Sequence, residues 1–194
     1  MKKRIISLFA AIALIAFVTN AQEVTKTTFG VRAGINFQNI NGKDYNGDKL
    51  TNNLIVGFNI GANVEIPIAQ DFFLQPGLLF TTKGAKINDE SPDTKINIGY
   101  IELPINFLYK PLLGNGHFML GFGPYVAYGV TGDASEFKAL DAGANILAGY
   151  EFASKLSFQL NAQLGLVKIN SVSTSGDKTS EKNTGFGFSL GYRF

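Results

Sequence analysis

The segment Thr184–Phe194 reads TGFGFSLGYRF. Apolar residues occupy every second position from Phe186 to Phe194, and small or polar residues stand between them. A period of two residues predicts a β-strand with one apolar face and one small or polar face. At the edge of a soluble sheet, a strand this long and aromatic would promote aggregation. The pattern therefore favours a strand of a membrane-spanning β-barrel over a soluble edge strand.

The same alternation recurs along the chain and predicts eight strands, at residues 27–37, 54–66, 72–83, 98–109, 118–130, 140–152, 156–167 and 184–194. Strands of about 9–11 residues suffice to cross a bilayer when they are tilted. Short turns alternate with longer polar loops, and the loops are residues 38–53, 84–97, 131–139 and 168–183. This is the connection pattern of outer-membrane barrels. The sequence thus predicts an all-β fold, an eight-stranded antiparallel up-and-down transmembrane β-barrel whose longer loops face outside.

Three prolines fall inside the predicted strands, namely Pro76, Pro104 and Pro124. Proline cannot donate a hydrogen bond to the ladder of a sheet. We therefore expect each of them at a bulge or at a strand end, with local irregularity around it.

The N-terminal residues predict export. Lys2, Lys3 and Arg4 precede an apolar run over residues 5–18, and small residues at positions 19 and 21 offer a cleavage site after Ala21. This is the pattern of a signal peptide at residues 1–21, and the run is shorter than the roughly 20 residues that a spanning helix needs. The predicted mature domain, residues 22–194, has 14 Lys and Arg (17 − 3) against 15 Asp and Glu. Its net charge near −1 and its lack of a basic cluster argue against a nucleic-acid partner, and the absence of Cys excludes disulfides and a lipoprotein anchor.

The distribution of glycine predicts which face of the barrel points outward. Fourteen of the 22 glycines lie on the face opposite the apolar side chains. The lumen of an eight-stranded barrel is narrow and is filled by side chains, so small residues belong inside it. A lipocalin-like soluble barrel would instead place the apolar face inside. We expect the apolar face to contact lipid, with aromatic residues near the strand ends forming two interfacial girdles.

Four motifs carry a resemblance to a known family: QPGLLFTTKG (75–84), YIELPINFLY (100–109), GPYVAYG (123–129) and GYRF (191–194). With the eight-strand pattern, they resemble the small outer-membrane β-barrel family of Bacteroidota, often labelled porin family or PorT-type barrels. The resemblance covers the whole mature chain and implies an outer-membrane location. It also implies an assembly signal in the last strand, read by the barrel assembly machinery and formed by Phe188, Leu190, Tyr192 and Phe194. The PorT-type label adds a component of a protein secretion system as one alternative function.

Residues that would carry chemistry are sparse. His117 is the only histidine, and we place it in a turn at the periplasmic end, without the nucleophile or carboxylate that hydrolysis at the outer leaflet requires. The spacing within residues 44–48 fails the EF-hand calcium pattern. The acidic residues within 89–93 are more consistent with a solvated loop than with a metal site. We therefore predict no catalysis, no metal and no cofactor.

Six charged residues fall on the face that the alternation assigns to the lumen, namely Arg32, Glu65, Lys83, Glu102, Glu151 and Arg193. Buried charges are costly unless they are paired. We expect a Lys83–Glu102 pair toward the outer end and a cluster of the two arginines with Glu65 and Glu151 toward the inner end. Such a cluster could be a structural plug or the selectivity lining of a pore, and the balance of charge favours the plug.

The function predicted from sequence is structural or surface-interacting, without catalysis. The expected partners are outer-membrane lipids and an unknown surface ligand that binds the four outer loops, and the expected state is a monomer. The alternatives are a narrow solute channel of the porin type and a component of a protein secretion system.

Overall fold

The computed structural model describes residues 26–43, 47–87, 94–135, 137–169 and 179–194. The eight long strands are β1 (Thr28–Lys43), β3 (Ile55–Ala69), β4 (Phe72–Ile87), β5 (Thr94–Tyr109), β7 (Gly116–Gly132), β8 (Leu140–Glu151), β9 (Leu156–Gly165) and β10 (Ser180–Arg193). Three short elements complete the list: β2 (Asn52–Asn53), β6 (Leu112–Leu113) and the 3₁₀ turn η1 (Asp133–Ser135). The predicted signal peptide, residues 1–21, lies outside the described residues.

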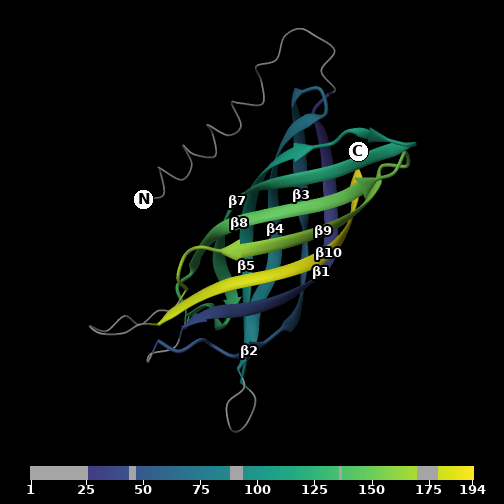
Figure 1. Cartoon of the computed structure of the whole chain (residues 1–194). Coiled ribbons are helices and arrows are strands. Elements are labelled where there is room, and N and C mark those ends of the chain that lie inside the picture. The colour runs from purple at the N-terminus through teal and green to yellow at the C-terminus, as the bar shows by residue number, and fades with distance from the viewer. Residues whose placement is uncertain (1–25, 44–46, 88–93, 136, 170–178) are drawn as a thin grey trace.

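The long strands form a closed barrel. Each one pairs antiparallel with the next long strand along the chain, and β1 and β10 close the cylinder along a continuous register from Gly30–Arg193 to Lys43–Ser180. Figure 1 shows the tilted strands around a common axis, with β10 in yellow between β9 and β1. This confirms the predicted eight-stranded antiparallel barrel. Among the described residues, no helix has the length and apolar character needed to cross a membrane.

The two ends of the barrel differ. We call the end that carries the short connections, between β3 and β4, β5 and β7, and β8 and β9, the turn end, and the opposite end the loop end. Several strands reach further toward the loop end than the alternation predicted: β1 runs to Lys43, β4 to Ile87, and β10 begins at Ser180. β9 instead ends at Gly165, two residues short of its predicted end. The predicted loops 38–53, 84–97 and 168–183 were therefore too long. Polar residues on both faces of these extensions concealed the strands, because the backbone ladder continues where lipid no longer demands an apolar face.

The prolines interrupt pairing without shifting it. The β3–β4 pairing skips from Asn63–Gly77 to Ile66–Leu74, beside Pro76, and the β5–β7 pairing skips from Pro104–Tyr125 to Phe107–Phe122. The register shifts lie elsewhere, between Pro67 and Ala69 and between Gly99 and Tyr100. The expected irregularity is present, but the expected bulge or strand-end placement of Pro76, Pro104 and Pro124 was wrong.

The apolar face points outward. Val56, Phe122 and Ile146 expose 64%, 62% and 61% of their surface, and such residues recur along all eight long strands. A water-soluble protein rarely exposes a contiguous apolar patch of more than a few hundred Å². The outward face is therefore built for lipid, and the soluble-barrel alternative is wrong.

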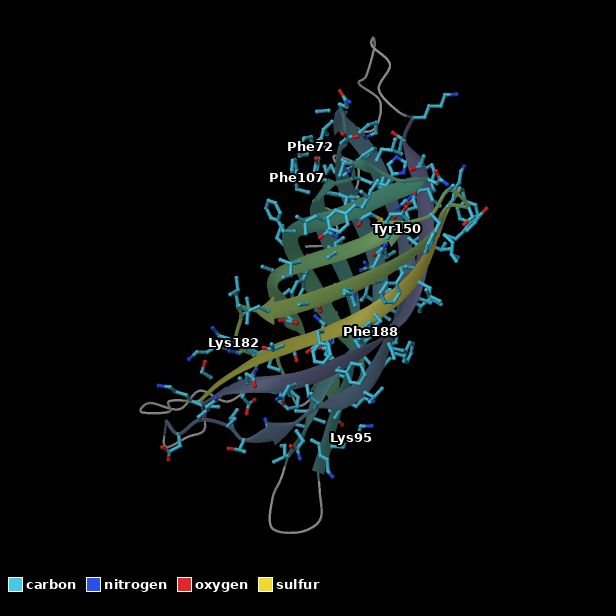
Figure 2. The ribbon with its side chains drawn as sticks, turned by 45° about the vertical axis from the view of Figure 1, so that its right-hand side comes forward. Phe72, Lys95, Phe107, Tyr150, Lys182 and Phe188 are labelled. Atoms are coloured by element: carbon cyan, nitrogen blue, oxygen red, sulfur yellow. The ribbon has the colours of Figure 1, made fainter. Side chains whose placement is uncertain are left out.

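Aromatic rings gather on the outward face near the turn end. The ring centroids of Phe72 and Tyr109 lie 4.9 Å apart, and Phe72 also contacts Phe107. Figure 2 shows Phe72 and Phe107 at one end of the barrel and Lys95 and Lys182 at the other. Aromatic rings near the ends of the strands, where the membrane meets water, are typical of the interfacial girdles of membrane barrels.

The interior also holds apolar clusters that the alternation did not predict. Leu108, Met119 and Leu147 are buried together against Phe73, and Leu79 is buried as well. Phe73 and Leu79 interrupt the two-residue pattern of their strand because their side chains belong to the lumen. The core of this protein is therefore a mixed filling of polar and apolar side chains inside the barrel.

Candidate functional site

The lumen contains most of the buried polar side chains, and at its turn end four charged residues meet. Lys110 Nζ lies 2.9 Å from Glu65 Oε2 and 2.8 Å from Glu151 Oε2. Arg193 contacts Glu65 through Nη2, and its Nε lies 3.7 Å from a Glu151 oxygen. Two cations thus alternate with two carboxylates, and all four side chains are at least 90% buried. We call this set the turn-end ion cluster.

The turn-end ion cluster differs from the predicted one in one member. Glu65, Glu151 and Arg193 lie together as expected, but Lys110 occupies the position that we predicted for Arg32. Lys110 follows directly after β5 and lies between the predicted strands 98–109 and 118–130. Its backbone N–H donates to the carbonyl of Asp71 at 2.7 Å, which extends the β4–β5 register by one residue and keeps Lys110 on the inward face with Leu108.

A second group of charges lies nearer the loop end. Lys83 Nζ is 2.8 Å from Glu102 Oε2, the expected pair, and 3.2 Å from Asp141 Oδ2. Asp141 also accepts hydrogen bonds from the Tyr125 hydroxyl at 3.3 Å and from Asn183 Nδ2 at 3.0 Å. The ammonium of Lys83 further sits 4.1 Å from the centroid of the Tyr125 ring, a cation–π contact. We call Lys83, Glu102 and Asp141 the loop-end ion cluster.

Asp141 was missed among the lumen charges although a signal for it existed. Its side chain is fully buried. By alternation it shares the inward face of β8 with Gly143 and Asn145, and the period of two places it in the lumen.

Arg32 stands apart from both ion clusters. Its Nη1 donates to Gln159 Oε1 at 3.4 Å, and within the described residues no carboxylate oxygen lies within 4.0 Å of its guanidinium. Together with Glu102 it lines an internal cavity of about 30 Å³. The predicted membership of Arg32 in the inner cluster was wrong, because its register places it nearer the middle of the barrel.

The loop end of the lumen is covered by an apolar cap. Ile40, Ala85 and Ile169 are buried together, with Ile96 and Phe137 packed against them. Backbone hydrogen bonds hold the cap: Lys138 N–H donates to the Ile169 carbonyl at 2.8 Å, and Ile169 N–H donates to the Glu181 carbonyl at 2.9 Å. Parts of two predicted outer loops therefore fold over the lumen.

The turn end opens into a mouth of about 720 Å³. The turn-end ion cluster forms part of its lining, together with Lys26, His117, Lys155 and Phe194. His117, predicted in a turn, belongs to the start of β7 at this end, opposite Glu151 in the register. Among the described residues, no group of three or more His, Asp or Glu side chains could hold a metal ion. Part of the calcium motif tested in the sequence (44–46) and the acidic segment 89–93 lie outside the described residues.

The residues of the expected assembly signal lie on the outward face of β10. Phe188, Leu190, Tyr192 and Phe194 expose between 38% and 64% of their surface. The backbone N–H of Phe194 donates to the carbonyl of Phe29 at 2.8 Å, so β1 holds the last residue at the turn end.

Charged side chains of both signs fill much of the described lumen. The buried charges comprise four cations and four carboxylates when Arg32 is counted with the two ion clusters. The interior of an eight-stranded barrel is just wide enough for side chains to fill it, and buried charges there are costly unless they are paired. The chemistry that this lumen supports is therefore charge pairing and hydrogen bonding.

Comparison with solved structures finds similar outer membrane proteins at low sequence identity, and the likeness to OprG supports the fold. The outer membrane protein OprG of Pseudomonas aeruginosa is 13% identical with a TM-score of 0.52, and the match covers 90% of this chain and 99% of OprG. Ail, the attachment invasion locus protein of Yersinia pestis, solved with the heparin analogue sucrose octasulfate, is 16% identical with a TM-score of 0.44, covering 88% and 100%. The outer membrane protein AlkL, solved in DMPC bilayers, is 11% identical with a TM-score of 0.46, covering 92% and 95%.

No curated protein matches the sequence significantly. The sequence model of the outer membrane protein β-barrel domain matches residues 8–194, almost the whole chain. With the closed eight-stranded barrel and its lipid-facing exterior, this match shows that the chain belongs to the outer membrane protein β-barrel domain family.

Proposed function

We propose that this outer-membrane barrel is a closed, non-catalytic protein that acts structurally or through surface interactions, with its loop end facing the exterior. The observation that carries the proposal is the filling of the lumen. Two ion clusters and the apolar cap close it at successive heights. A protein whose interior is closed in this way presents its rim as the surface available to partners.

The loop end supports the surface role. β1, β4, β5 and β10 continue as paired strands beyond the apolar belt. Lys43 and Lys95 are exposed on these extensions. Segments that project past the lipid are the part of a barrel that can meet an external ligand, here through the regions 38–53, 84–97, 131–139 and 168–183. Interaction with membrane lipids, assembly through the last strand and a monomeric state belong to the same proposal.

Conductance of the purified protein in planar bilayers tests the closed lumen. We expect no stable, reproducible channel events from the wild-type monomer. A narrow solute channel is the alternative. Unitary conductance steps of uniform size, whose frequency rises with protein concentration, would establish it. The variant Lys83→Met provides a matched comparison, because it removes one cation that lies across the lumen and leaves the exterior unchanged.

A further inference from the structure

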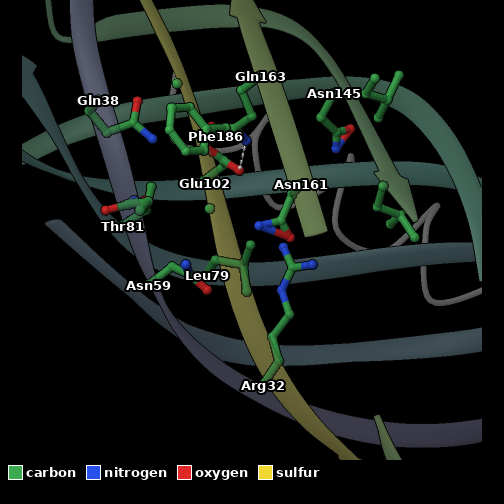
Figure 3. A pocket seen from close by; sticks show the side chains of 15 residues that line it. Arg32, Gln38, Asn59, Leu79, Thr81, Glu102, Asn145, Asn161, Gln163 and Phe186 are labelled. Atoms are coloured by element: carbon green, nitrogen blue, oxygen red, sulfur yellow. Dashed lines mark hydrogen bonds between the residues drawn. The ribbon is translucent and has the colours of Figure 1, made fainter. Parts of the chain in front are cut away.

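The middle of the lumen contains a small polar chamber. Its volume is about 30 Å³, and one water needs roughly 10–15 Å³ of such space, so the chamber has room for about two waters. Its polar lining residues include Arg32, Asn36, Gln38, Glu102, Asn145 and Asn161. Figure 3 shows the guanidinium of Arg32 directed toward Asn161, with the Gln163–Glu102 hydrogen bond close by.

A chain of hydrogen bonds fixes the orientation of one chamber side chain. The carboxylate of Glu65 can only accept, so Gln75 Nε2 donates to it at 3.1 Å. Gln75 Oε1 then accepts from Asn106 Nδ2 at 3.2 Å, and Asn106 Oδ1 accepts from Asn145 Nδ2 at 2.9 Å. Asn145 is 7% exposed, and its Oδ1 has no hydrogen-bond partner in the described part of the chain.

Asn36 presents a second oxygen with a fixed orientation. Its Nδ2 donates to the Thr82 carbonyl at 3.2 Å and to Thr81 Oγ1 at 2.9 Å. Because a carbonyl cannot donate, the Thr82 carbonyl fixes the position of the amide nitrogen, and the Oδ1 of Asn36 lies where a Cβ on Gly57 of β3 would meet it. Asn36 is 4% exposed, and this oxygen too finds no partner among the described residues.

Arg32 contributes a hydrogen-bond donor, whereas Asn36 and Asn145 contribute acceptors. Its Nε is a buried donor for which the described residues offer no acceptor. The loop-end ion cluster has one cation and two carboxylates, whereas the turn-end ion cluster has two of each. The positive charge of Arg32 balances the extra carboxylate of the loop-end ion cluster. Arg32 is part-buried, and a guanidinium that is partly removed from water is costly without a polar contact to the charge that balances it.

The chemistry of the lining selects the occupant. A metal cation would suit the amide oxygens but would meet the guanidinium, and an anion would suit the guanidinium but would meet those oxygens. Water both donates and accepts, and buried waters make about three hydrogen bonds each. We propose that the chamber is a built water site, in which about two ordered waters link Arg32 to Glu102 and to the oxygens of Asn36 and Asn145. Arg32 is thereby a positioning residue of the loop-end ion cluster, coupled to it through water.

Crystals of the wild-type protein test the occupant directly. We expect electron density for water within hydrogen-bond distance of Asn36 Oδ1 and Asn145 Oδ1. Separate soaks in rubidium and bromide should give no anomalous peak in the chamber. A rubidium peak, a bromide peak or an empty chamber would each overturn the proposal.

A double-mutant cycle tests the coupling. Arg32→Met should raise the unfolding equilibrium constant, and Asp141→Asn should offset part of that effect because it removes the excess carboxylate. For groups in one network we expect a coupling of about tenfold in the equilibrium constant. Arg32→Met combined with Glu151→Gln is the control, because Glu151 belongs to the balanced turn-end ion cluster, and this pair should be additive within about twofold. Additivity in both cycles would refute the coupling.

Discussion

Glu65 is the side chain whose replacement should damage the barrel most. It is 1% exposed and accepts from three donors, on Lys110, Arg193 and Gln75. The variant Glu65→Gln keeps the size of the side chain and removes its charge, which leaves two cations facing one carboxylate in the turn-end ion cluster. Each cation keeps at least one other partner: Lys110 keeps Glu151 at 2.8 Å, and Arg193 keeps Asn63 at 2.7 Å and a Glu151 oxygen at 3.7 Å.

The remaining contacts set the size of the expected loss. Breaking a buried ion pair commonly costs about 3–5 kcal/mol. Because both cations retain a partner and the mouth of about 720 Å³ admits water, we expect the lower value of about 3 kcal/mol. That corresponds to roughly a hundredfold in the unfolding equilibrium constant.

Urea unfolding in lipid vesicles measures this loss. The chain has no tryptophan, so the folded fraction is followed by circular dichroism and by the mobility of unboiled samples in electrophoresis. Asp71→Asn is the matched control: it removes one carboxylate at the same end, and Asn tolerates the backbone φ of 60° found there. If Glu65→Gln lost no more than about 0.5 kcal/mol beyond this control, which is the ordinary range for surface substitutions, the turn-end ion cluster would not stabilise the fold.

Three further outcomes follow from the geometry. A Cβ on Gly34 would overlap a backbone carbonyl of β10, whereas one on Gly77 would lie 3.3 Å from its nearest neighbours. Gly34→Ala should therefore shift the urea midpoint to a much lower concentration, and Gly77→Ala should not. Equal midpoints would contradict the close approach of β1 and β10. Deletion of Phe194 should reduce the folded, heat-modifiable fraction in cell membranes far more than Phe194→Tyr does, and normal assembly of the deletion would refute a recognition role for this residue. On intact cells an impermeant thiol reagent should label Lys95→Cys at the loop end but not Asn115→Cys at the turn end, and the reverse pattern would invert the proposed orientation.

Alternation predicted the strands well because lipid requires an apolar side chain at each outward position of every strand. From Phe186 to Phe194 each outward position must be apolar, and the structure exposes those side chains as expected. The constraint ends at the edge of the lipid. Lys86 pairs with Lys95 in the β4–β5 ladder, and no apolar period marks that extension, so the strands were predicted too short.

Lumen contacts depend on a second quantity, the height of each residue in the barrel. Lys83 and Glu102 lie on adjacent strands and meet as the alternation suggested. Arg32 was expected nearer the middle than the other members of the inner cluster, and whether it reaches them depends on strand tilt and stagger, which the alternation does not report. Lys110 was missed for a different reason: it lies one residue past the end of the predicted strand, although it keeps the inward parity of Asn106 and Leu108.

The lumen joins its charges through directed amides. Glu65 at the turn end is an acceptor only, and this property orients the amides of Gln75, Asn106 and Asn145 one after another. The last amide oxygen, Asn145 Oδ1, belongs to a residue that lines the chamber together with Arg32. Neutral amides without such an anchor could each adopt either orientation at similar energy. The carboxylate of Glu65 therefore does more than neutralise two cations. It sets the polarity of a hydrogen-bonded path from the turn-end ion cluster to the middle of the barrel, so that a carbonyl oxygen, and not an amide N–H, faces the chamber that Arg32 shares.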